Sequence, residues 1–161
     1  MTLSHVVPNA EKDKMKLSDN NQKTLMLAIH QKIEKYADYV ADKLNNGETT
    51  DLLTYPPNCE LTDNEKQALE KLKNDQDLKS ALRKILADNS AGVIFELMNY
   101  LDGTADPDEN LGDWTEIAFV DRTEEIEPPN DMLHDNFYST YWDWKEIRPN
   151  SDWTLDINET E

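Results

Sequence analysis

Residues 25–44 read LMLAIHQKIEKYADYVADKL, and this stretch sets the helical character of the fold. Its apolar residues recur every three or four positions, which is the period of one face of an amphipathic helix. They are Leu25, Ile29, Ile33, Tyr36, Val40 and Leu44. Asp19 is a suitable cap at the start, and Asn46-Gly47 supplies the stop. The pattern predicts a long helix packed along that face.

Further helical signals follow. Thr62 and Glu65 have the spacing of a capping box, in which each side chain bonds the other residue's backbone amide. The apolar residues within 78–86 form a second helical stripe. Ser90 is expected to cap a separate, strongly apolar helix ending at Asp102-Gly103. We expect that helix to be the most buried element, with these residues in the core: Phe95, Met98 and Tyr100.

The pattern changes after Gly103. Residues 114–120, WTEIAFV, are rich in β-branched and aromatic residues, which favours a strand buried on both faces. Residues 151–158, SDWTLDIN, alternate in hydrophobicity and suit a second short strand or an extended tail. The predicted fold class is therefore mainly α (α+β), with four to five helices and a small two- or three-stranded sheet in the C-terminal part.

A last helix is predicted over 131–147, between Pro128-Pro129 and Pro149. On a helical wheel one arc is expected to face the core, and it holds Leu133, Phe137, Tyr141 and Trp144. Tyr138 and Trp142 fall outside that arc, and Trp142 borders a stripe of carboxylates. Two readings stay open: the C-terminal segment covers Trp142, or Trp142 faces solvent and a partner.

The domain organisation follows these patterns. We expect a flexible N-terminal arm over 1–17 and a single domain over 18–161. Within it, 18–103 is helical and near-neutral, and 104–161 is acidic and rich in aromatic residues. One cysteine, Cys59, excludes an internal disulfide and fits a reducing compartment, and no stretch resembles a signal peptide or a membrane span, so we expect a cytoplasmic protein.

Charge is distributed unevenly along the chain. The formal net charge is -18. Residues 1–90 hold 13 Lys/Arg and 15 Asp/Glu, whereas residues 91–161 hold 3 Lys/Arg and 19 Asp/Glu and also all four Trp and all three Phe. Such a surface repels nucleic acid and anionic membranes and attracts basic proteins. The expected partner is therefore a basic protein, with no nucleic acid and no membrane.

Motifs for catalysis are mostly absent. The four glycines form no phosphate-binding loop, and no catalytic residue or cofactor is predicted. The nearest motif to a metal site is a partial calcium loop, which matches at Asp106, Asp108 and Asn110 and then fails, because Leu111 replaces its glycine and Ile117 its bidentate glutamate. An alternative function is a metal-dependent hydrolase using these carboxylates and His134.

In size, charge and layout, the chain resembles bacterial immunity proteins, which protect a cell against a toxin. The resemblance rests on no shared motif and assigns no residue roles. It implies inhibition of a basic toxin, such as a nuclease, by direct binding. A close alternative is a nucleic-acid mimic that blocks a DNA-binding protein. The predicted partner-binding residues are Glu124, Glu125, Glu127, Asp135, Tyr138, Trp142 and Asp143.

Overall fold

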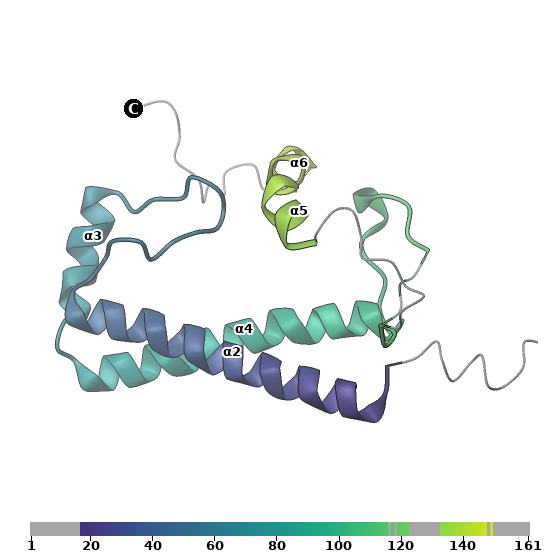
Figure 1. The fold of residues 1–161 in the computed structure, drawn as a ribbon. Helices are drawn as coiled ribbons and strands as arrows, with labels where there is room; N and C mark the ends of the chain where they lie inside the picture. The colour runs from purple at the N-terminus through teal and green to yellow at the C-terminus, as the bar shows by residue number, and fades with distance from the viewer. Residues whose placement is uncertain (1–16, 116, 118, 123–132, 148, 150–161) are drawn as a thin grey trace, which may run out of the picture. The chain divides into compact units, whose positions relative to one another are not determined.

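The computed structural model describes residues 17–115, 117, 119–122, 133–147 and 149, and the described part is helical (Figure 1). Its α-helices are α2 (Asp19–Asn46), α3 (Asp63–Leu69), α4 (Gln76–Leu101), α5 (Leu133–Ser139) and α6 (Tyr141–Ile147). Short 3-10 helices, η2 (Glu70–Leu72) and η3 (Glu109–Leu111), lie between them. Over the described ranges, no helix is both long and apolar enough to cross a bilayer.

The predicted sheet is wrong for the residues that the structure describes, none of which is in a β-strand. Within the first predicted strand, Ile117 and Phe119 are exposed rather than buried on both faces. β-branched and aromatic residues favour a strand only when a neighbouring strand supplies packing and backbone hydrogen bonds. The second predicted strand, in 151–158, lies outside the described residues.

The chain divides into two compact units. Unit 1 contains 1–35 and 87–127, and unit 2 contains 36–86 and 128–161. Both α2 and α4 are therefore shared between the units. The prediction of a single domain over 18–161 stays a prediction, and so does the flexible arm, which lies outside the described residues except for Leu17.

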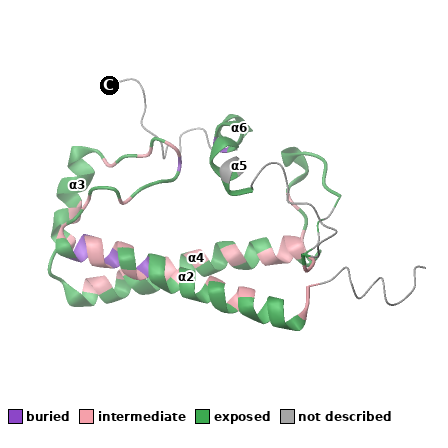
Figure 2. Cartoon of the chain, in the orientation of Figure 1, coloured by how far each residue is buried: buried purple, intermediate pink, exposed green. Residues whose placement is uncertain are grey.

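Unit 2 contains the hydrophobic core of the described residues (Figure 2). Ala37, Ala41 and Leu44 are buried on one face of α2, whereas Tyr36 is 64% exposed. The buried face is thus turned by about one residue from the predicted stripe. The alanines explain this shift of the buried face, because their small side chains let another helix approach more closely than tyrosine does.

Ion pairs in unit 2 show how α4 runs against α2. Arg83 pairs with Asp38 at 3.4 Å, and Lys79 pairs with Asp42. The later residue of α2, Asp42, pairs with the earlier residue of α4, Lys79, so the paired segments are antiparallel. These pairs are partly exposed, so they orient the helices more than they stabilise them.

Helix ends agree with the sequence prediction in two places and differ in two. The end of α2 at Asn46 and the capping box at Thr62 and Glu65 are confirmed. The predicted cap of α2 is wrong, because Asp19 is already the first helical residue and the Ser18 hydroxyl accepts from the Asn21 backbone N–H at 3.4 Å. The separate helix starting at Ser90 is wrong, because α4 continues through Ser90 and Gly92 to Leu101. A helical glycine costs about 1 kcal/mol relative to alanine, which is too little to end a helix with good helix formers on both sides.

Candidate functional site

An aromatic cluster in unit 2 joins the loop before α3 to the helices α5 and α6. The Tyr55 ring stacks on Phe137 at a centroid distance of 5.4 Å and meets the Tyr141 ring edge-on at 5.5 Å. Tyr141 in turn contacts Trp142 edge-on at 5.3 Å. We call this set the aromatic cluster: Tyr55, Phe137, Tyr138, Tyr141 and Trp142.

Tyr55 is the member of the cluster that sequence reasoning missed. It lies in a connector without periodic hydrophobicity, so no helical or strand pattern marks it. The local signal is its position directly before Pro56, which is fully buried. A buried proline anchors this connector in unit 2, and it places the Tyr55 ring against α5 and α6.

The predicted core arc of the last helix is corrected by the structure. Of its four residues only Tyr141 is buried, at 2% exposure, while Leu133, Phe137 and Trp144 are exposed. The helix is also interrupted at Thr140, which separates α5 from α6. A single wheel over 131–147 therefore misplaces residues across the interruption, because the two segments need not share one helical phase.

Trp142 is partly open to solvent, at 42% exposure. The Lys145 ammonium lies over its ring, with Nζ 5.6 Å from the centroid, which is within the range of a cation–π contact. Glu146 is also exposed and follows Trp142 by four residues in α6, so the two share one helical face. The α6 surface thus offers an aromatic ring and a carboxylate side by side.

The predicted partner-binding residues are only partly described. Tyr138, Trp142 and Asp143 are exposed and belong to the helices of unit 2. Asp135 is in α5, but its side chain is outside the described part. The sequence predicts an acidic loop just before the last helix, and its residues Glu124, Glu125 and Glu127 also lie outside the described part. The set as a binding site stays a prediction.

The candidate metal loop in unit 1 borders a pocket of about 540 Å³ that includes Asp106, Glu109 and Asp113 in its lining. Among the residues that the structure describes, no three His, Cys, Asp or Glu side chains are close enough together to hold a metal ion. Asp108 precedes η3 and Asn110 lies within it. His134 belongs to unit 2 rather than to this loop's unit.

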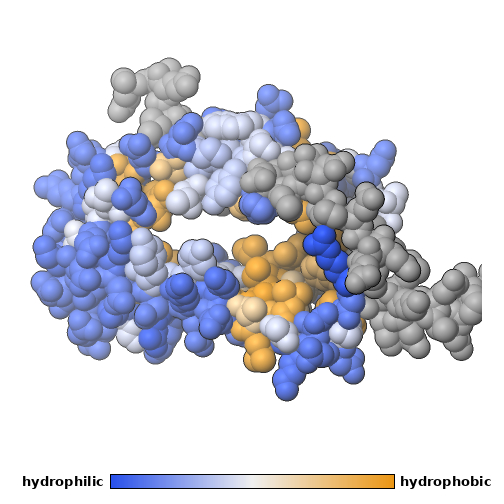
Figure 3. Space-filling view, in the orientation of Figure 1, coloured by the Kyte–Doolittle hydropathy of each residue, from blue (hydrophilic) through white to orange (hydrophobic). Residues whose placement is uncertain are grey.

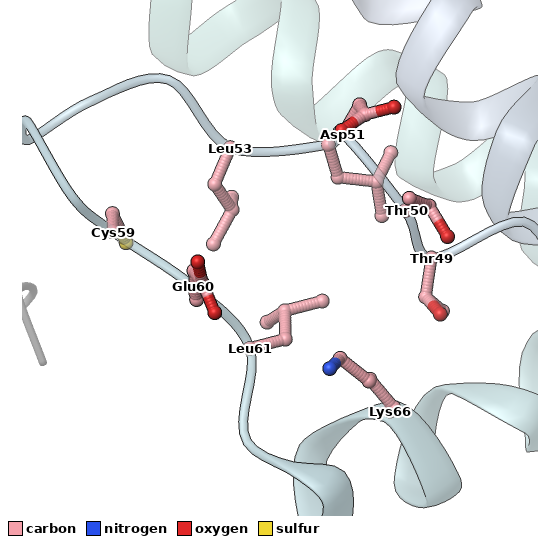
Figure 4. A pocket seen from close by; sticks show the side chains of 9 residues that line it. Thr49, Thr50, Asp51, Leu53, Cys59, Glu60, Leu61 and Lys66 are labelled. Atoms are coloured by element: carbon pink, nitrogen blue, oxygen red, sulfur yellow. The ribbon is translucent and has the colours of Figure 1, made fainter.

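A second pocket, of about 330 Å³, lies in unit 2 beside Cys59. Figure 4 shows Leu53, Leu61 and Lys66 pointing into it from the connector and α3. Lys66 also pairs with Asp63 at 3.7 Å, and Glu60 and Asp51 line the same pocket. The lining mixes apolar, acidic and basic groups without a set that selects one ligand.

Carboxylate hydrogen bonds fix the start of α2 in unit 1. The Asp121 carboxylate accepts from the Asn21 side-chain amide at 2.8 Å and from the Ser18 backbone N–H at 3.1 Å. These bonds favour the charged form and lower the pKa of Asp121, with the Asn21 bond the largest cause. Asp121 thus acts as a distant cap for the first turn of α2.

The second half of α4, in unit 1, carries apolar residues on more than one side. Val93, Phe95 and Leu97 are exposed, with Phe95 at 65%, and no described residue of unit 1 is buried. Figure 3 shows hydrophobic surface gathered over this part of α4. The expectation that this helix is the most buried element, with Phe95 in the core, is therefore wrong; Met98 and Tyr100 are half-buried.

Exposed apolar side chains at this density are typical of surfaces that bind another protein. Comparison of the chain with protein-family models, curated proteins and solved structures finds no match.

Proposed function

We propose that this chain is an acidic protein that binds a basic partner protein and neutralises it, as a bacterial immunity protein neutralises a toxin. The observation that carries the proposal is the exposure of aromatic rings on α5 and α6 in a chain of net charge -18. A nuclease toxin is a suitable partner, because a cleft that binds phosphates is basic and is attracted to carboxylates.

Acidic and aromatic residues have different roles in such a complex. The acidic loop residues Glu124 and Glu125 speed encounter, because long-range attraction raises the association rate. Trp142 holds the complex once it has formed, because a desolvated tryptophan often supplies much of the binding energy.

Binding kinetics separate these roles. Glu124→Lys combined with Glu125→Lys is expected to slow association and to weaken its dependence on salt. Trp142→Ala is expected to speed dissociation, at a cost of about 2 kcal/mol or more if Trp142 is a hot spot. The assignment would be contradicted if the charge-reversed variant mainly changed dissociation and Trp142→Ala mainly changed association.

The first partner to test is the product of the gene that adjoins this one. Cells that make that product are expected to stop growing, and co-expression of this chain is expected to restore growth. The charge-reversed variant, checked for its normal helix content by circular dichroism, is the control for direct binding. A harmless or acidic neighbouring product would contradict the immunity function, and equal rescue by the charge-reversed variant would contradict the role of the acidic loop.

A further inference from the structure

The α6 surface combines three groups that together recognise one kind of side chain. Trp142 presents a partly exposed ring, and Glu146 presents an exposed carboxylate one helical turn later. Lys145 already places an ammonium over the Trp142 ring at 5.6 Å. The ring face therefore accepts a cation in the free protein.

Arginine fits this pair of groups better than lysine does. Its guanidinium is planar and weakly hydrated, so it can stack on an aromatic ring while its N–H groups donate to a carboxylate. A lysine ammonium is compact and strongly hydrated, and it gains less from leaving water for the ring. The net charge of -18 favours any basic residue, and the ring next to a carboxylate favours arginine among them.

We infer that Trp142 and Glu146 form a docking site for an arginine side chain of the partner protein, and that Lys145 occupies the ring face until the partner displaces it. This inference rests on the proposed function and specifies its chemistry. Lys145 thereby acts as an internal competitor, which shields the ring in the free chain and lowers affinity for weakly matched partners.

Two nine-residue peptides test the site without the natural partner. One alternates glycine with arginine, and the other alternates glycine with lysine, so the two carry the same charge. Calorimetry on the full chain at physiological salt is expected to show about three- to fivefold tighter binding of the arginine peptide. Trp142→Ala and Glu146→Gln are each expected to remove that preference.

The chain offers matched controls outside the proposed site. Trp144→Ala removes a tryptophan of nearly equal exposure, 40%, from the opposite face of α6, and Glu70→Gln removes one exposed carboxylate charge from η2. Both controls are expected to keep the arginine preference. Lys145→Gln is expected to strengthen binding of the arginine peptide more than that of the lysine peptide, because it frees the ring as well as removing a charge.

Folding is monitored by a thermal melt of each variant. Trp142→Phe retains an aromatic face and is expected to retain the preference, so it tests the site if Trp142→Ala unfolds. Equal binding of the two peptides to the native chain, or an arginine preference that Glu146→Gln leaves unchanged, would overturn the arginine site and leave a purely electrostatic partner. If neither peptide binds at millimolar concentration, the proposed function itself is contradicted.

Discussion

Tyr141 and Trp142 are adjacent in α6 but differ in exposure, at 2% and 42%, and alanine substitutions of each should therefore have unequal effects. Tyr141→Ala removes a fully covered ring that contacts Tyr55 and Trp142. Truncation of a buried aromatic residue to alanine costs about 3–5 kcal/mol. That cost approaches the whole stability of a marginal domain, which starts at about 5 kcal/mol.

Trp142→Ala should cost less, because only a little over half of the side chain is covered. A tryptophan can bury about 200 Å², and at about 25 cal/mol per Å² the covered share corresponds to about 3 kcal/mol. Compactness of the unfolded chain and the methyl group left by alanine reduce this to about 2 kcal/mol.

Urea denaturation of the two variants, followed by circular dichroism, measures the difference. The midpoint should fall clearly more for Tyr141→Ala than for Trp142→Ala, with unchanged slopes. An equal loss for both variants would show that Trp142 is packed as tightly as Tyr141. In that case Trp142 would belong to the core and would not be available to a partner.

Three other predictions follow from the helices and their caps. Gly92→Ala should stabilise the chain by roughly 0.5–1 kcal/mol in a urea titration, because Gly92 is inside α4 and an added Cβ meets no atom within 4 Å. Gly103→Ala should destabilise the chain, because Gly103 has a φ of 66°, which alanine rarely adopts. Equal effects of these two glycine variants would contradict a continuous α4. Thr62→Ala should lower stability by about 1 kcal/mol through loss of the capping box, while Thr54→Ala in the connector should have little effect, and helix content by circular dichroism checks both. Hydrogen bonds lower the pKa of Asp121, through Asn21 first, and of Glu65, through Thr62, so their contribution to stability is complete at neutral pH and is lost as the pH falls below the usual carboxyl range of about 4; urea midpoints that stay constant down to pH 3 would contradict this.

Local sequence signals predicted the parts of the fold that depend on neighbouring residues. The C-terminal end of α2 and the capping box of α3 follow from Gly47 and Thr62, whose effects act within one helical turn. The strand at 114–120 failed because a strand also needs a partner that is remote in sequence. The prediction of a separate helix starting at Ser90 was wrong, because a serine marks the start of a new helix only where the residues before it disfavour helix.

The candidate site was predictable only in part for the same reason. The spacing of Tyr138 and Trp142 identified them as lying off the expected core arc, and both are exposed. Tyr55 reaches α5 and α6 from about 80 residues earlier in the chain, which no periodic pattern reveals. Exposure of Phe137 and Trp144 could not be foreseen either, because it depends on the interruption at Thr140.

The exposed second half of α4 has a consequence for how long the protein persists in a cell. Unit 1 has helices but no buried side chain among its described residues, so this described part gains little from hydrophobic burial when it folds. A partner that covers this surface binds only the folded chain and adds to its stability by mass action, in proportion to the logarithm of the partner's free concentration. Proteases degrade the opened form. The lifetime of this chain should therefore rise with the abundance of such a partner, so that the cellular concentration of this chain follows that of the partner.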